Sequence, residues 1–520
     1  MIDALLKYSL RNTVAPFVLA AIVAGWGYYG FRSLTVEAFP DPTDTQVSVI
    51  TLLPGQPTEE VERRVSIPLE RALNGTPGLF RLRSISLFGL SNVTLTFNEG
   101  VDPLIARQQV LERASQAELP DGIKPSLGPL ATPIGEVFRY SLESDTTDLM
   151  ELRTLQEWNV RPRLLQVPGV ADVVSYGGLI KEVHVEPDPA RMASLHVDLS
   201  SLFEALQKAS HNASGGYVER GSEMFVIRSI GIFSDVKDIE QVRVAFHGDV
   251  PVTVKDVAAV RVGYAPRQGI VSRGKEEDAV EGIVLMRRGE NPSQVLAAMR
   301  TVVNDLNGGQ LPKGVRIKAF YDRTELVDST LKTVFRNLTE GAVLVIAVLF
   351  VFLMSLRASL IVAAIIPLSL LASFLYLHLR GMSANLLSMG AVDFGIIVDG
   401  AVILVEHLFH KIDAGDHPET LKSRILHAAE EVARPTLFSM LIIIAAYIPI
   451  FSLQRVEGRI FGPMAHTVVS ALVGALIFSF TLVPVLVWLA LRRSRKALPD
   501  SPVLRGLRKA YDPTLRLALS

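Results

Sequence analysis

The chain has 520 residues, of which 49% are hydrophobic, and its mean hydropathy is +0.32. A formal net charge of −1 gives no electrostatic reason to expect binding to nucleic acid. The chain contains no cysteine, which excludes disulfides and thiolate metal sites within it, so any metal ligand must be a carboxylate, an imidazole, a thioether or a carbonyl group.

The first apolar segment, 12–31, is long enough to cross a bilayer, which takes roughly 20 helical residues. Lys7 and Arg11 precede it, as basic residues precede the apolar part of a signal peptide. However, the segment ends in aromatic residues, among them Trp26 and Tyr28, rather than at a small-residue cleavage site. Aromatic residues suit the membrane interface. We therefore interpret 12–31 as an uncleaved membrane anchor.

The next 300 or so residues, 32–337, alternate strand and helix patterns and do not resemble a membrane segment. The patterns predict strands at 46–51, 92–97, 182–186, 279–286 and 315–321, and helices at 58–73, 148–155 and 291–306. The order of these elements indicates small α+β sandwiches of the split βαβ type. The stretch 190–265 interrupts this order, and we expect it to be an inserted subdomain.

Five further apolar segments follow, at 338–355, 359–378, 386–408, 435–453 and 464–491. Arg357 lies in the short turn between two of them, and a basic stretch, 492–496, follows the last. If six spans cross in succession, these residues and those before the anchor lie on one side, and positive residues mark the cytoplasm. We therefore expect both ends of the chain to be cytoplasmic and 32–337 to lie on the outer side.

The fourth span carries three carboxylates, Asp393, Asp399 and Glu406. A charge at mid-bilayer costs about 2.5–3.5 kcal/mol on insertion scales, so such residues are rarely without function. Asp399 lies near the middle of the span, Glu406 lies on nearly the same face one heptad later, and Asp393 lies about 120° away around the helix. The predicted spans contain no Lys or Arg, so the carboxylates are either protonated or paired with a cation from outside this chain. This ladder favours a proton or ion path.

The last residues, from 497 on, are basic and amphipathic at 504–511, which suits the cytoplasmic surface of a membrane. The final residues, 515–520, read as the opening of another apolar segment, which favours a fragment or a naturally split half.

Three motifs of the fourth span resemble the signature of the heavy-metal efflux branch, cobalt-zinc-cadmium type, of the resistance-nodulation-division (RND) transporters: Asp393-Phe394-Gly395, Asp399-Gly400-Ala401 and Val405-Glu406. Three more motifs resemble the first porter subdomain of that family: Pro40-Asp41, Leu53-Pro54-Gly55 and Pro68-Leu69-Glu70. The family usually has Asn where this chain has His407. The resemblance covers essentially the whole chain.

The resemblance implies the N-terminal half of an RND transporter, in which an α-helical membrane bundle of six transmembrane helices carries an α+β periplasmic domain of ferredoxin-like (split βαβ) porter subdomains. The parts expected from it are an anchor helix (1–31), a first porter subdomain (32–134), a second porter subdomain in two pieces (135–189 and 266–337), an inserted docking subdomain (190–265), helices two to six (338–496) and a cytoplasmic-surface segment (497–520).

The resemblance also implies a function: a proton-driven antiporter, not an enzyme, that exports divalent heavy-metal cations (Zn, Co, Cd or Ni) across a cell inner membrane without a permanently bound cofactor. Such proteins work as homotrimers in membrane lipid, with a periplasmic adaptor (membrane fusion) protein and an outer-membrane channel. Asp399 matches the central proton-carrying aspartate, and Asp393 and Glu406 match the accessory carboxylates. The basic partners of this relay and most of the substrate site would lie in the second half of the transporter.

The stretch Thr132-Pro133-Ile134-Gly135-Glu136 resembles the porter strand in which zinc-type members place a glutamate facing the metal cleft. Glu136 is therefore a candidate metal ligand, with a solvent-facing strand-edge glutamate as the alternative. Three histidines, His407, His410 and His417, surround the cytoplasmic end of the fourth span, as metal-entry residues or as interfacial residues without a ligand role. His466, near the outer end of the sixth span, is a candidate for neutral packing or for the relay.

Several other functions compete with this interpretation. Exporters of organic compounds in the same superfamily usually have adjacent aspartates, whereas Gly400 follows Asp399 here. A copper or silver exporter is disfavoured because the methionines form no paired ladder. An intramembrane aspartyl protease needs two facing aspartates, and an ATP-driven pump needs a phosphate-binding loop that the sequence lacks. The last alternative is a fragment that binds a partner and transports nothing alone.

Overall fold

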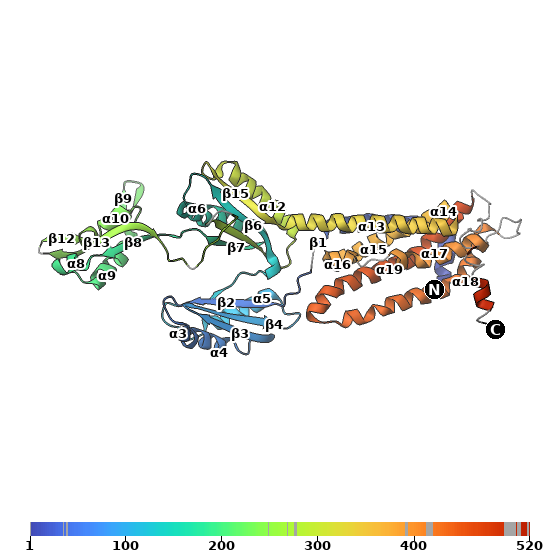
Figure 1. The fold of residues 1–520 in the computed structure, drawn as a ribbon, viewed down its shortest axis with the longest axis horizontal. Helices are drawn as coiled ribbons and strands as arrows, with labels where there is room; N and C mark the ends of the chain where they lie inside the picture. The colour runs from blue at the N-terminus through green and yellow to red at the C-terminus, as the bar shows by residue number, and fades with distance from the viewer. Residues whose placement is uncertain are drawn as a thin grey trace. The chain divides into compact units, whose positions relative to one another are not determined.

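The structure is a computed structural model that describes residues 2–34, 36–37, 40–247, 249–267, 269–274, 278–390, 394–411, 420–492, 506, 511–516 and 519. The chain forms two compact units. The first comprises Met1–Val137, Met286–Ala297 and Asp322–Ser520, and the second comprises Phe138–Leu285 and Ala298–Tyr321. Figure 1 shows the helices and strands of each.

In the first unit, six helices among the described residues are long and apolar enough to cross a membrane. They are Val14–Ser33, Arg323–Phe352, Leu356–Leu379, Ser388–Lys411, Leu421–Ser452 and Arg455–Arg492. In the labels of Figure 1 they contain α2 (Val14–Ser33), α13 (Arg323–Leu353), α14 (Leu356–Ala363) with α15 (Ile365–Leu379), α16 (Leu386–Gly390) with α17 (Phe394–Lys411), α18 (Leu421–Ala446) and α19 (Arg455–Arg492).

Three of these helices begin well before the apolar segments that predict them. Helix α13 begins at Arg323, where the carboxylate of Asp322 accepts a hydrogen bond from the Thr324 backbone N–H at 2.9 Å. Helix α18 begins after Thr420, and α19 begins at Arg455. Hydropathy locates only the apolar part of a helix, and polar first turns extend these helices beyond it. The predicted segments that begin at 338, 435 and 464 therefore mark the apolar part of each helix rather than its first residue.

Small residues bring the membrane helices close together. A Cβ atom added at Gly27 of α2 would lie 2.3 Å from the Leu371 carbonyl oxygen of α15, and one added at Gly474 of α19 would lie 2.8 Å from the Ala372 Cβ. Neither position tolerates a side chain without separating the helices, a close approach typical of membrane bundles. A separate helix, α1 (Ile2–Arg11), precedes the anchor and buries Leu6 and Leu10 in the same core.

The first unit also contains a four-stranded sheet in the order β3-β4-β2-β5. Its elements follow the order β-α-β-β-α-β: β2 (Gln46–Leu52), a helix from Thr58 to Leu73 (α3, a π-helical turn at Glu62–Ser66, and α4), β3 (Leu79–Leu87), β4 (Leu90–Phe97), α5 (Pro103–Ser115) and β5 (Ser126–Leu127). One face of this helix is apolar and fully buried, with Val61, Val65, Leu69 and Leu73 four residues apart. A short parallel pair joins β1 (Val36–Glu37) to β16 (Ala384–Asn385).

The second sheet, largely in the second unit, repeats this order of elements. It consists of β6 (Glu136–Ser144), a helix from Leu149 to Leu165 (α6, a π-helical turn and α7), β7 (Val170–Gly177), β14 (Val280–Met286), α12 (Pro292–Asp305) and β15 (Val315–Asp322). Its strand order is β15-β6-β14-β7. In both sheets the strand that comes first in the chain lies between the third and the fourth, and the second lies at the edge beside the third. Asp148 caps the first helix, since its carboxylate accepts a hydrogen bond from the Glu151 backbone N–H at 2.8 Å.

A smaller body is inserted between the second and third strands of this second sheet. Antiparallel strands β8 (Lys181–Pro187) and β13 (Ala258–Tyr264) form its base. Between them lie α8 (Pro189–Ser194), α9 (Leu199–Ala209), β9 (Ala213–Arg220), β10 (Glu223–Ser229), α10 (Val236–Glu240), β11 (Arg243–His247), β12 (Val250–Thr253) and α11 (Val254–Val257). The hairpin β9–β10 is exposed at every residue.

Candidate functional site

Helix α17 presents two of the three predicted carboxylates on one face. Asp399, Ile403 and Glu406 are exposed, at spacings of four and three residues that align them along one side of the helix. The opposite side is buried in the bundle core, including Val398, Ala401 and Val405. The described part of the chain therefore leaves the carboxylate side of α17 uncovered. Asp393 lies outside the described residues.

The glycine next to Asp399 fixes the opposite side of α17. A Cβ atom at Gly400 would lie 2.7 Å from the Met440 Sδ and 3.2 Å from the Thr436 Cγ2, both on α18. Any side chain there would displace the buried Met440 side chain, so Gly400 allows α17 and α18 to pack closely. At Gly390, in contrast, an added Cβ atom would meet nothing within 4 Å.

In the last turns of α17, His407 and Lys411 share one carboxylate on α18. The His407 Nε2 lies 3.1 Å from the Glu431 Oε2, and the Lys411 ammonium donates to the other carboxylate oxygen. His410 is exposed, and His417 lies outside the described residues. His407 thus connects α17 to α18, and the part of the chain that the structure describes holds no group of three His, Asp or Glu residues able to bind a metal ion.

His466 lies among aromatic residues in the first third of α19. Its Nδ1 is 3.1 Å from the Tyr376 hydroxyl, and its ring meets that of Phe451 edge-on with centroids 4.7 Å apart. It also lines a cavity of about 470 Å³ in the first unit. Charged side chains line the same cavity: Asp41, Arg287, Arg288, Glu290, Arg323 and Arg459. None of these arginines was singled out by the sequence patterns.

Glu136 is the first residue of β6 and is half-buried. It follows a short 3-10 turn, Pro133–Gly135, in which Ile134 and Gly135 line the same cavity. Its role as a metal ligand stays a prediction.

Comparison with known proteins places these features in a family. The sequence profile of the AcrB/AcrD/AcrF family matches residues 5–520. The chain is 38% identical to the cobalt-zinc-cadmium resistance protein CzcA of Cupriavidus metallidurans, over all of this chain and 50% of that protein. It is 36% identical to the nickel and cobalt resistance protein CnrA of the same organism, over all of this chain and 52% of that protein.

A solved structure agrees with the sequence comparisons. A crystal structure of a heavy metal efflux pump superposes with a TM-score of 0.86 at 42% identity, covering 94% of this chain and 49% of that one. The chain thus spans about half the length of the curated relatives it matches. It belongs to the AcrB/AcrD/AcrF family of RND proteins, among relatives that are named for heavy-metal efflux.

Proposed function

We propose that this chain is one half of a proton-driven antiporter that exports divalent heavy-metal cations of the Zn, Co, Cd or Ni type. One observation carries the proposal: an apolar membrane helix presents Asp399 and Glu406 on a single face that the described residues leave uncovered. The names of the relatives, which include cobalt, zinc, cadmium and nickel resistance, support the choice of cargo.

Asp399 carries the transported proton in this proposal, and Glu406 and Asp393 are accessory carboxylates. A carboxylate in a membrane loses hydration, which favours its neutral form, whereas a nearby cation favours the charged form. If the second half brings a basic side chain to the uncovered face of α17, the two effects oppose each other. Asp399 can then bind a proton from the outer side and release it to the cytoplasm.

Six transmembrane spans, with both chain ends in the cytoplasm of an inner-membrane protein, are part of the same proposal. The six apolar helices and the basic residues near 7–11 and 492 support it. We assign the two sheets of identical strand order to ferredoxin-like porter subdomains, 32–134 and 135–189 with 266–337, and the inserted body at 190–265 to a docking subdomain.

The proposed assembly is a homotrimer in membrane lipid that works with a periplasmic adaptor and an outer-membrane channel. The hairpin β9–β10 supports contact between copies, because apolar side chains such as Tyr217, Met224 and Val226 are more than 60% exposed on it. Contiguous exposed apolar side chains mark interaction surfaces.

The replacement Asp399→Asn tests the proposal in cells that express the complete transporter, this chain together with its second half. The amide cannot release a proton, so we expect metal tolerance to fall to that of cells without the transporter while the protein level in the membrane stays normal. Asp121→Asn, the same chemical change at an exposed turn, is the control and should keep full tolerance. Full tolerance with Asp399→Asn would remove the proposed mechanism.

The cargo role of Glu136 has its own test. Carboxylate oxygens bind Zn²⁺ at about 2.0–2.2 Å, and loss of one ligand weakens a site. We expect Glu136→Gln in the complete transporter to bind Zn²⁺ more weakly in calorimetric titration, whereas Glu151→Gln, at an exposed helical position, leaves the affinity unchanged. Equal affinities for the two variants would return Glu136 to a strand-edge role.

A further inference from the structure

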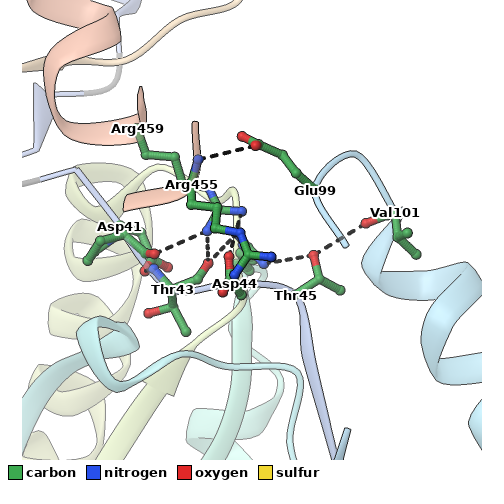
Figure 2. Close-up of polar contacts among 10 residues, drawn as sticks. Asp41, Thr43, Asp44, Thr45, Glu99, Val101, Arg455 and Arg459 are labelled. Atoms are coloured by element: carbon green, nitrogen blue, oxygen red, sulfur yellow. Dashed lines mark hydrogen bonds and ion pairs between the residues drawn. The ribbon is translucent and has the colours of Figure 1, made fainter. Parts of the chain in front are cut away.

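The outer end of α19 is bound to the linker that leads into the first sheet. We call residues 41–45, which directly precede β2, the linker. The Arg459 Nη1 donates to the carbonyl oxygens of Pro42 at 3.1 Å and Thr43 at 2.5 Å, and its Nη2 lies 3.2 Å from the Asp44 Oδ1. Figure 2 shows the Arg459 side chain reaching Thr43 and Asp44. The Arg459 and Asp44 side chains are only 20% and 24% exposed, so water competes weakly for these contacts.

A second arginine holds the same linker. The Arg288 Nη2 donates to the Thr43 carbonyl oxygen at 2.9 Å, so two guanidinium groups share that one acceptor. Arg288 also contacts the Thr45 hydroxyl at 3.3 Å, and this hydroxyl donates to the Val101 carbonyl oxygen at 3.3 Å. The Asp41 carboxylate accepts from the Thr43 N–H at 2.9 Å. These hydrogen bonds therefore hold the linker in one conformation.

The first residue of α19 is attached to the same subdomain. The Arg455 backbone N–H donates to the Glu99 Oε2 at 3.2 Å, and its guanidinium lies 3.9 Å from the centre of the Phe80 ring. Arg455 has a φ of 54°, a left-handed backbone conformation that residues other than glycine rarely adopt. Such strain persists only where surrounding contacts impose it. These contacts fix the direction in which α19 leaves the subdomain.

Helix α19 continues from these contacts into the core that holds the carboxylate helix. It extends over 38 residues, a length of about 57 Å, with prolines at positions 463 and 484 inside it. Val468 and Leu472 of α19 belong to the same buried cluster as Val405 and Leu408 of α17. Close-packed helices transmit displacement because interiors have few voids. The cavity of about 470 Å³, lined by Asp41 and Arg459, leaves room for the linker to shift.

We propose that Arg459 is a positioning residue that couples protonation of the α17 carboxylates to movement of the first sheet. A change of charge on Asp399 displaces α17, α19 moves with it, and Arg459 pulls the linker and hence β2. A planar guanidinium spreads five donors over three nitrogen atoms in a fixed geometry and so reaches two carbonyl groups and a carboxylate, whereas lysine presents its three donors from a single nitrogen atom. This inference rests on the proposed proton-driven export.

The test uses the complete transporter in proteoliposomes, with a pH gradient as driving force and Zn²⁺ as the transported probe. We expect both Arg459→Lys and Arg459→Gln to lower kcat about tenfold or more with little change in KM, because binding is intact and only movement is lost. Arg434→Gln, which removes an arginine with a 73% exposed side chain from the same bundle, is the matched control and should transport normally.

A cross-link between these two positions gives a measurement that would not change if Arg459 only stabilised the fold. This chain contains no cysteine, so Arg459→Cys with Asp44→Cys introduces its only thiols. A short bis-maleimide joining them should restore transport that the double variant lacks before cross-linking. If Arg459→Gln fails to assemble, Arg288→Gln, which removes the second donor to Thr43 and the contact with Thr45, replaces it and should also lower kcat.

The outcomes separate this inference from the function on which it rests. Wild-type kcat in the arginine variants, or no recovery on cross-linking, overturns the coupling role of Arg459. If Asp399→Asn is inactive in the same vesicles while Arg459→Gln is fully active, only the coupling inference fails. If Asp399→Asn itself transports at the wild-type rate, the proposed proton-driven function fails.

Discussion

Asp399 and Gly400 are neighbours in the sequence, yet they face different surroundings. Successive residues on a helix are 100° apart, so the carboxylate lies on the exposed side while Gly400 packs against Met440 and Thr436. A second carboxylate at position 400 would not fit beside α18 without displacing it. This packing agrees with the single aspartate at this point of the fourth span and argues against the organic-compound exporters, which usually have two.

A pair of glycine substitutions tests this packing. Gly400→Ala should lower the thermal stability of the purified protein, because overpacking costs typically about 1–3 kcal/mol. Gly390→Ala is the matched control, since nothing lies within 4 Å of the added methyl group and alanine favours helix by about 1 kcal/mol. If both substitutions shift the unfolding midpoint alike, contact with α18 is not what selects glycine at 400.

The elements with regular patterns were predictable from the sequence. Strand β4 alternates buried and half-buried residues along its whole length, and the helix from Thr58 to Leu73 buries every fourth residue, so the period alone identifies both. The faces of Asp399 and Glu406 followed from the same helical geometry. In contrast, the first turns of α13, α18 and α19 are polar, and hydropathy says nothing of them.

The contacts of the linker could not be predicted. Arg459 and Thr43 are 416 residues apart, and the acceptor is a backbone carbonyl group that leaves no signal in side-chain identity. The hairpin β9–β10 was also missed, because its strands lack the buried side on which an alternating pattern depends. Sequence patterns predict which face of a helix or strand is buried, but they do not predict polar contacts between residues far apart in the sequence.

Strand β6 carries an ion cluster whose stability should depend on pH. Glu143 accepts hydrogen bonds from Ser141 at 3.1 Å and Lys318 at 3.3 Å and pairs with Arg273. Burial raises the pKa of Glu143, but the hydrogen bonds from Ser141 and Lys318 and the charge of Arg273 outweigh it, so this pKa lies below its ordinary value. The cluster therefore stabilises the fold at neutral pH and loses this effect as the pH falls below about 4.5 through the lower folded-state pKa.

Glu143→Gln should accordingly destabilise the protein at pH 7 by about 1.5–3 kcal/mol, the range for hydrogen bonds to charged groups. The difference from the wild type should shrink as the pH approaches the folded-state pKa, and thermal unfolding at a series of pH values measures it. Glu151→Gln, at an exposed helical position, is the control. A difference that stays constant across the series would assign the effect to packing rather than to charge.

At the scale of the whole molecule, two surfaces are incomplete in a single copy of this chain. One is the carboxylate face of α17, and the other is the hairpin β9–β10. In the proposed function, a cation from the second half pairs with the carboxylates of the first surface, since an unpaired charge in a bilayer is costly. The second calls for an apolar partner, which we assign to a neighbouring copy.

Replacing 213–229 by a short Gly-Ser loop tests the second assignment. We expect the complete transporter to leave a size-exclusion column as a monomer, because the apolar contact between copies is gone. The same replacement at the exposed turn 121–122 should leave the trimer intact. Trimers that persist without the hairpin would place the interface elsewhere.

The most direct measurement of the central claim is proton movement driven by metal. In proteoliposomes that contain the complete transporter and a pH-sensitive dye, a Zn²⁺ gradient should drive proton flux in the opposite direction, and Asp399→Asn should abolish that flux while the protein remains assembled. Zn²⁺ transport without any proton movement, or equal proton flux in wild type and Asp399→Asn, would contradict the role of this carboxylate.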